Sequence, residues 1–125
     1  MSQRVSLSRT LGLAAIVLLG CAETDMPRVV VDGGDAERGR IEIARLQCGA
    51  CHDIPGVRAA RGSVGPPLAG FAHRVYLAGK WPNRPDYLEP WLRDPPAMAP
   101  LTAMPALVHD SQSARDIAAY LYTLE

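Results

Sequence analysis

The feature that most constrains this chain is a cluster of two cysteines and a histidine, Cys48-Gly-Ala-Cys51-His52. The only other cysteine among the 125 residues is Cys21. Two thiols three residues apart, followed at once by an imidazole, suit three kinds of chemistry: a redox-active dithiol, half of a zinc site, or the covalent attachment of a haem. The rest of the sequence has to decide among them.

A zinc site and a redox dithiol both need features that the sequence does not supply. A structural zinc ion usually takes two separated ligand pairs, and the second pair would have to be His73 and His109, which are isolated from each other. A thioredoxin-like motif begins a helix within alternating strands and helices, whereas here a helical pattern ends near Cys48. These two interpretations are therefore disfavoured.

Covalent haem attachment fits the motif best, because Cys-x-x-Cys-His is its signature. Two thioether bonds would fix the chain along one edge of the porphyrin, and the next residue could then reach the iron. We predict that Cys48 and Cys51 hold one haem c and that His52 is an axial ligand. The length suits a single small domain, and 11 Pro, 11 Gly and a single Phe predict a loop-rich chain with a small hydrophobic core. Such a domain is often stabilised by a bound group of this kind. The net charge of zero gives no indication of a nucleic-acid partner.

The N-terminus has the pattern of an export signal. Arg4 and Arg9 precede the apolar run Leu11–Gly20, which is shorter than the roughly 20 residues that span a bilayer. The sequence Leu18-Leu19-Gly20-Cys21 resembles the lipobox of bacterial lipoproteins, whose cysteine is diacylated. An ordinary secretory signal with an incidental cysteine is the alternative.

We therefore predict three parts: a lipoprotein signal peptide at 1–20, a lipidated N-terminus and tether at 21–34, and a functional domain at 35–125. The resemblance to lipoproteins implies export, with Cys21 anchoring the chain in a bacterial membrane that faces the periplasm.

Two amphipathic helices are expected at the ends of the domain. Asp35 can cap the first, with Glu37 in its first turn, and the second is expected to begin at the capping-box-like Ser113–Asp116. Their apolar faces are Gly39, Ile43 and Leu46 in the first helix and Ile117, Tyr120, Leu121 and Leu124 in the second. We expect the helices to cross, with Gly39 leaving room for the Tyr120 ring.

Residues 35–125 resemble the class I cytochrome c family. The motifs that carry the resemblance, besides the cysteines, are Gly65-Pro66-Pro67-Leu68, Arg74, Trp91-Leu92-Arg93-Asp94-Pro95 and Pro100-x-Thr102-x-Met104-Pro105. The resemblance implies an all-α fold with crossing terminal helices and loops wrapped around one covalently bound haem.

The resemblance also implies roles for single residues. The Pro66 carbonyl would accept a hydrogen bond from His52, Arg74 would pair with a haem propionate, and Met104 would be the sixth ligand. Trp91 stands where the family more often has tyrosine. Met98, His73 and His109 are the other candidates for sixth ligand, and the four prolines between 95 and 105 argue against a regular helix there.

The predicted function is one-electron transfer in a respiratory chain, without enzymatic activity or a small-molecule substrate. Residues 65–105 resemble the cytochrome c domain fused to subunit II of caa-type oxidases, through Leu77-Ala-Gly, Pro82-Asn83 and the run 88–95. This implies a quinol-oxidising complex or a dehydrogenase as donor and a terminal oxidase as acceptor. The alternatives are a haem subunit of a periplasmic dehydrogenase complex, or a haem enzyme or gas sensor with an open sixth site.

Overall fold

The computed structural model describes residues 28–125. The predicted signal peptide, Cys21 and the first part of the predicted tether lie outside the described residues. Among residues 28–125, no helix combines the length and the apolar character that crossing a bilayer requires.

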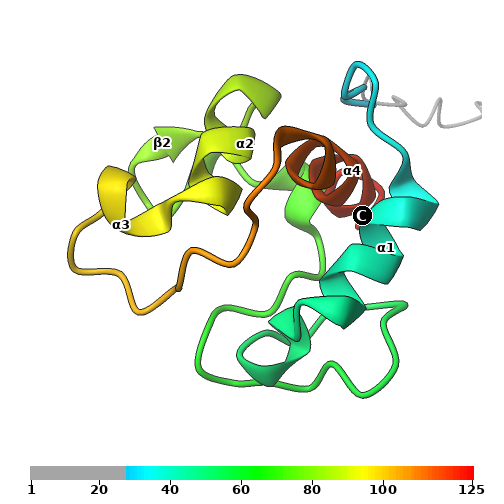
Figure 1. Cartoon of the computed structure of the whole chain (residues 1–125), viewed down its shortest axis with the longest axis horizontal. Coiled ribbons are helices and arrows are strands. Elements are labelled where there is room, and N and C mark those ends of the chain that lie inside the picture. The colour runs from blue at the N-terminus through cyan, green and yellow to red at the C-terminus, as the bar shows by residue number, and fades with distance from the viewer. Residues whose placement is uncertain (1–27) are drawn as a thin grey trace, which may run out of the picture.

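The described chain is mostly helical (Figure 1). Its α-helices are α1 (Ala36–Arg45), α2 (Pro85–Arg93), α3 (Pro95–Met98) and α4 (Ser111–Leu121), and short 3₁₀ turns lie at Cys48–Ala50 and Phe71–His73. The all-α prediction missed one feature, an antiparallel pair of two-residue strands, β1 (Tyr76–Leu77) and β2 (Trp81–Pro82). The tight turn between them places Ala78 at φ 48° and Gly79 at φ 68°.

Helix α1 begins and ends close to where the sequence predicts. The Asp35 carboxylate accepts a hydrogen bond of 2.8 Å from the Arg38 N–H, which confirms the N-cap. Gly39 and Ile43 are buried, and Leu46 packs against the core just after the helix. The predicted apolar face is therefore the face that meets the rest of the fold.

Helix α4 begins earlier than predicted. Its N-cap is Asp110, whose carboxylate accepts a 2.8 Å hydrogen bond from the Ser113 N–H. The prediction placed the start at Ser113 because a carboxylate stands three residues later, at Asp116. That carboxylate instead lies in the helix interior, with a side chain that is only 5% exposed.

The crossing of α1 and α4 depends on Gly39, but not through Tyr120 as predicted. A Cβ atom at Gly39 would lie 1.9 Å from the backbone oxygen of Asp116, so the two helix backbones are in contact. The Tyr120 hydroxyl instead donates a 2.6 Å hydrogen bond to the Pro55 carbonyl, beside Gly56. A backbone approach this close is available only to glycine.

Asp116 joins the two helices with polar contacts. It accepts hydrogen bonds from the Asp35 N–H at 2.8 Å, from Arg38 Nε at 2.8 Å and from Gln112 Nε2 at 2.9 Å. The Arg38 guanidinium is the main cause that lowers the pKa of Asp116 to about 2. Burial alone would raise this pKa. Since the pKa is lowered, the hydrogen bonds to Asp116 outweigh the desolvation of its carboxylate.

The last residues of the predicted tether pack on the domain. Val31 is buried, with 6% of its surface exposed, as expected for part of Val29–Val31, whereas Val30 is 78% exposed. Gln112 donates a hydrogen bond of 2.8 Å to the Gly33 carbonyl. Residues 31–34 therefore lie against α4.

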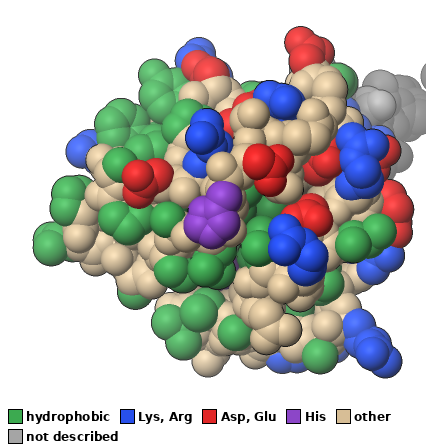
Figure 2. All heavy atoms as spheres, viewed as in Figure 1, with side chains coloured by type: hydrophobic (Ala, Val, Ile, Leu, Met, Phe, Trp, Pro, Cys, Tyr) green, Lys and Arg blue, Asp and Glu red, His purple; other side chains and the backbone are tan. Residues whose placement is uncertain are grey.

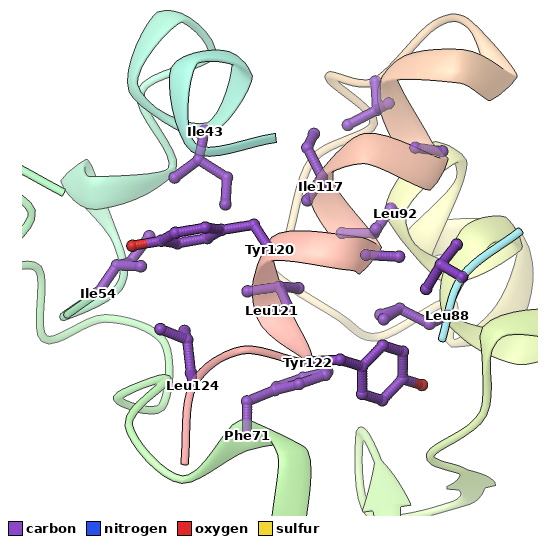
Figure 3. Close-up of a cluster of buried hydrophobic side chains, with 14 of the residues drawn as sticks. Ile43, Ile54, Phe71, Leu88, Leu92, Ile117, Tyr120, Leu121, Tyr122 and Leu124 are labelled. Carbon is purple, nitrogen blue, oxygen red and sulfur yellow. The ribbon is translucent and has the colours of Figure 1, made fainter. Parts of the chain in front are cut away.

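The hydrophobic core surrounds the inner face of α4 (Figure 3). Ile43 reaches it from α1 and Leu88 from α2, while Phe71 meets Tyr122 edge-on with ring centroids 5.7 Å apart. Tyr122 also donates to Asn83 Oδ1 at 3.1 Å, which ties the end of α4 to the β2–α2 connection.

The proline-rich part contains two helices, and the second was not expected. Helix α2 begins at Pro85, and Pro90 lies in its interior. Residues 95–98 form the one-turn helix α3, because Pro95 and Pro96 occupy first-turn positions and Asp94 caps the Ala97 N–H at 3.1 Å. From Ala99 to Asp110 the chain has no helix or strand.

Candidate functional site

An apolar pocket lies between α1, α2, α4 and the loops after the Cys-x-x-Cys-His motif. Its cavity volume is about 60 Å³. The lining residues are Ile43, Cys48, His52, Ile54, Leu68, Phe71, Leu88, Trp91, Leu92, Met104, Ile117 and Leu121. Four residues predicted for the site, Cys48, His52, Trp91 and Met104, therefore share one largely hydrocarbon pocket.

His52 is oriented by its neighbours. Its Nδ1 atom lies 2.8 Å from the Pro66 carbonyl oxygen, so a protonated Nδ1 donates there and leaves Nε2 free to act as a ligand. Gly65 makes this approach possible, because a Cβ atom there would lie 2.4 Å from the imidazole Cε1. The Gly65 N–H also donates to the Cys51 carbonyl at 2.8 Å, which fastens this loop to the motif.

The two cysteines lie on one turn of chain. Cys48 begins the short 3₁₀ turn and Cys51 follows it; both thiols are free and half-buried. Burial raises the pKa of the Cys48 thiol. Cys48 lines the pocket and Cys51 does not.

Met104 reaches the pocket from the loop between α3 and α4. Its backbone N–H donates to Thr102 Oγ1 at 3.2 Å, which forms a small turn just before Pro105. The other candidates for sixth ligand lie elsewhere: Met98 ends α3, and His73 and His109 are exposed. None of these three lines the pocket.

Arg74 and Pro66 border the site without lining the pocket. Arg74 donates to the Pro67 carbonyl, and its guanidinium carbon lies 5.5 Å from the centroid of the Phe71 ring, which is part of the pocket wall. Arg74 and His52 are thus both hydrogen-bonded to the same two-proline turn. The pairing of Arg74 with a propionate stays a prediction.

Trp81 has an unsatisfied polar atom that sequence reasoning could not find. Its ring stacks on Tyr87, with centroids 5.9 Å apart, and it is not among the pocket-lining residues. In the described chain, Trp81 Nε1 is the buried side-chain nitrogen or oxygen that has no hydrogen-bond partner. A buried N–H of this kind normally has an acceptor.

The donor set limits what the pocket could hold. Residues 28–125 contain no group of three or more His, Cys, Asp or Glu side chains placed to hold a metal ion. The pocket instead combines one imidazole and one thioether within apolar walls, with a thiol at its edge. These donors match the chemistry of a haem c site: thioether-forming cysteines, and His and Met as axial ligands.

Part of the chain is similar to a subunit of a respiratory oxidase. No family model matches the chain. The chain is similar to cytochrome c oxidase subunit 2 of Alkalihalophilus pseudofirmus, with 32% identity over 91 residues, which are 72% of this chain and 26% of that protein. The chain thus spans about a quarter of the length of that relative.

Proposed function

We propose that this chain is a class I c-type cytochrome that carries single electrons in a respiratory chain and donates them to a terminal oxidase. The observation that supports this most is the meeting of His52 and Met104 in one apolar pocket beside Cys48. The partial match to an oxidase subunit agrees with the same function.

In this proposal Cys48 and Cys51 would form the thioether bonds to a haem, and His52 Nε2 and Met104 Sδ would bind its iron. A bound haem would supply a one-electron ferric–ferrous couple, which methionine ligation biases towards the reduced form. The Pro66 carbonyl holds the proton on His52 Nδ1 and so keeps the imidazole in the ligating tautomer.

The remaining residues shape the environment. Trp91 and the aliphatic lining exclude water from the pocket. Arg74 and the unsatisfied Trp81 Nε1 are two donors that could satisfy propionate oxygens. Two protein ligands leave no open position for a substrate, and this favours a carrier over a haem enzyme or gas sensor.

The proposed setting is the periplasmic face of a bacterial membrane, with the chain held by lipid on Cys21. A tether raises the effective concentration of the domain near its partners. A quinol-oxidising complex or a dehydrogenase would supply the electrons. The alternative is a fixed haem subunit of a dehydrogenase complex.

The test begins with the purified full-length product. Haem should stay attached after denaturation, and Cys48→Ala or Cys51→Ala should sharply reduce attachment, whereas Cys21→Ser should alter processing and membrane association but not the absorption spectrum. Membranes lacking the protein should take up oxygen more slowly and recover when the reduced protein is added. Unchanged oxygen uptake, with rapid oxidation by another acceptor, would contradict the oxidase assignment and leave only a general carrier.

A further inference from the structure

The hairpin formed by β1 and β2 presents apolar side chains to solvent. Leu77 is buried and attaches the hairpin to the core, whereas Val75 is 71% exposed and Tyr76 is 58% exposed. The Asn83 N–H donates to the Val75 carbonyl at 3.0 Å, and the Lys80 N–H donates to the Leu77 carbonyl at 2.9 Å. The exposed side chains therefore belong to a hairpin that the fold holds in place.

The chain around this hairpin carries positive charge and no negative charge. No Asp or Glu occurs between Asp53 and Asp86, whereas five Lys or Arg residues do. Lys80 lies in the hairpin itself, with its Nζ atom 4.9 Å from the centroid of the Trp81 ring. None of the ion pairs in the part of the chain that the structure describes includes Lys80. The hairpin thus combines exposed apolar side chains with a cation that has no acidic partner.

These surroundings distinguish the hairpin from other exposed apolar residues. Ile41, 52% exposed on α1, lies between the ion pairs Glu37–Arg40 and Glu42–Arg45, and a single apolar residue among charges is ordinary on a protein surface. In Figure 2 hydrophobic side chains gather at the upper left, over the part of the fold where Figure 1 places β2. Exposed apolar side chains that gather in one place often mark an interaction site.

The hairpin lies towards the side of the domain where the described chain begins. Arg28 Nη2 donates a hydrogen bond of 3.0 Å to Glu125 Oε1 at the C-terminus. The neighbouring Leu124 carbonyl accepts a 3.0 Å hydrogen bond from the Ala72 N–H, three residues before Val75. Figure 1 shows β2 and the start of the described chain in the upper half of the same view. These contacts connect the end of the predicted tether to the base of the hairpin.

The length of the predicted tether limits how far this side can be from the membrane. Arg28 is the seventh residue after Cys21, and a chain of that length spans at most about 25 Å. A lipid on Cys21 would therefore hold the bilayer surface within that distance of Arg28, on the side of the domain that carries the hairpin.

We propose that the β1–β2 hairpin rests on the bilayer surface, with Val75 and Tyr76 in the interfacial region and Lys80 beside the phosphate groups of anionic lipids. This inference rests on the lipid anchor of the proposed function. Tyrosine is favoured at membrane interfaces, where its ring meets apolar groups and its hydroxyl meets water. The negative surface of an anionic leaflet attracts a basic side chain and repels an acidic one.

The contact would be intramolecular, so it need not be strong. Once lipid on Cys21 is inserted, the hairpin stays at a high effective concentration near the bilayer. None of residues 75–82 lines the pocket, so the hairpin can rest on lipid while the pocket stays clear of the bilayer. Two points of attachment would restrict the orientation of the domain on the membrane, which the tether alone would not do.

A spin label can locate the hairpin relative to the bilayer. In the proposed mature holoprotein Cys21 carries lipid and Cys48 and Cys51 are bonded to haem, so an added cysteine would be the free thiol. Val75→Cys would be labelled with a nitroxide and compared with Val64→Cys, because Val64 has a similar exposure, 76%, and follows the Cys-x-x-Cys-His motif. Both lipidated proteins would be reconstituted into vesicles of phosphatidylcholine and phosphatidylglycerol. The measurement is the ratio of label collisions with oxygen, which concentrates in lipid, to collisions with a water-soluble nickel chelate.

We expect this ratio to be roughly threefold or more higher at residue 75 than at residue 64, because only the first label would reach the interfacial region. Tyr76→Asp and Lys80→Glu, each added to Val75→Cys, should lower the ratio towards that of residue 64, because both place negative charge at an anionic surface. Lys80→Arg keeps the positive charge and should keep the high ratio. The haem absorption spectrum should be the same in every variant and checks that the fold is intact.

Other results would overturn the proposal. Equal ratios at residues 64 and 75 in a lipidated protein would show that the hairpin makes no specific contact with lipid, and would leave the anchor and the electron-transfer function standing. Spin–spin broadening at residue 75 that disappears on dilution with unlabelled protein would assign the hairpin to a second copy of the chain. A mature protein whose mass lacks the lipid would contradict the anchor, and this inference with it, even where haem is attached.

Discussion

At the crossing of α1 and α4, the two backbones touch at Gly39, and Asp116 joins α1, α4 and residue 35 through several hydrogen bonds. Around Met104 the chain is held quite differently. Along residues 103–109, all described in the structure, the one backbone hydrogen bond runs from the Met104 N–H to Thr102 Oγ1. Val108 is the buried residue of this segment.

The difference separates contacts that the protein makes with its own residues from a loop that borders a pocket. The crossing needs no group from outside the protein. Gly39 lets the two helix backbones touch, and Arg38 pairs with the charge of Asp116. The Met104 loop borders a pocket and has few contacts of its own, so we expect its position to depend on what the pocket holds. The following variants test that contrast, in order of decreasing expected effect.

The largest effect is expected at the helix crossing. In Gly39→Ala the new methyl group would overlap the Asp116 backbone oxygen, so the helices must separate. We expect a loss of about 3 kcal/mol or more in the free energy of unfolding, measured by urea denaturation. Ile41→Ala on the exposed side of α1 is the control. An equal and small effect in both variants would show that the crossing is not the rigid part of the fold.

A smaller effect is expected at Asp116. Asp116→Asn removes the charge that binds Arg38, and we expect it to cost about 2 kcal/mol at neutral pH. The pKa of Asp116 is lowered in the folded protein to about 2 from 3.8, so its stabilisation is present above about pH 4 and is lost as the pH falls towards 2.

The pH dependence provides the check. The stability difference between parent and Asp116→Asn should shrink between pH 4 and pH 2, measured by urea unfolding at each pH. Asp32→Asn, at an exposed carboxylate, is the control and should leave the free energy of unfolding at neutral pH unchanged. A difference that is constant over this range would show that Asp116 does not titrate with folding.

The smallest effect on stability is expected in the Met104 loop. Thr102→Val should lower the free energy of unfolding by less than about 1 kcal/mol, because it removes a single hydrogen bond from a half-buried loop. The same change should loosen Met104, so the ferric protein should bind added imidazole up to about fivefold more tightly in an absorbance titration. Thr102→Ser keeps the hydroxyl and should resemble the parent. Equal imidazole affinity in all three proteins would remove Thr102 from any role in holding Met104.

Much of this architecture was predictable because helical periodicity and capping are local. The Asp35 cap and the buried face of α1 follow from residues within a few positions of each other. The start of α4 was missed because Asp110 and Ser113 are both good caps, and the choice between them depends on where Asp116 is buried. The β1–β2 turn was missed because it places Ala78 in the left-handed region, which alanine rarely adopts.

The features of the candidate site also fall into those that local sequence predicts and those that depend on the fold. The Cys-x-x-Cys-His motif is local, and the sequence predicts its residues directly. The hydrogen bond from His52 to Pro66 was expected only through a resemblance, and the structure contains it. The contact of Arg74 with Pro67 and the unsatisfied Trp81 N–H depend on the folded chain and leave no pattern in the sequence.

The most direct test of the central claim is the absorption spectrum of the ferric protein in Met104→Ala and Met98→Ala. The parent should show the weak sulfur-to-iron charge-transfer band, Met104→Ala should lose it, and Met98→Ala should retain it, because Met104 lines the pocket beside His52 and Met98 does not. A band that survives in Met104→Ala, or is absent from the haem-containing parent, would contradict the account.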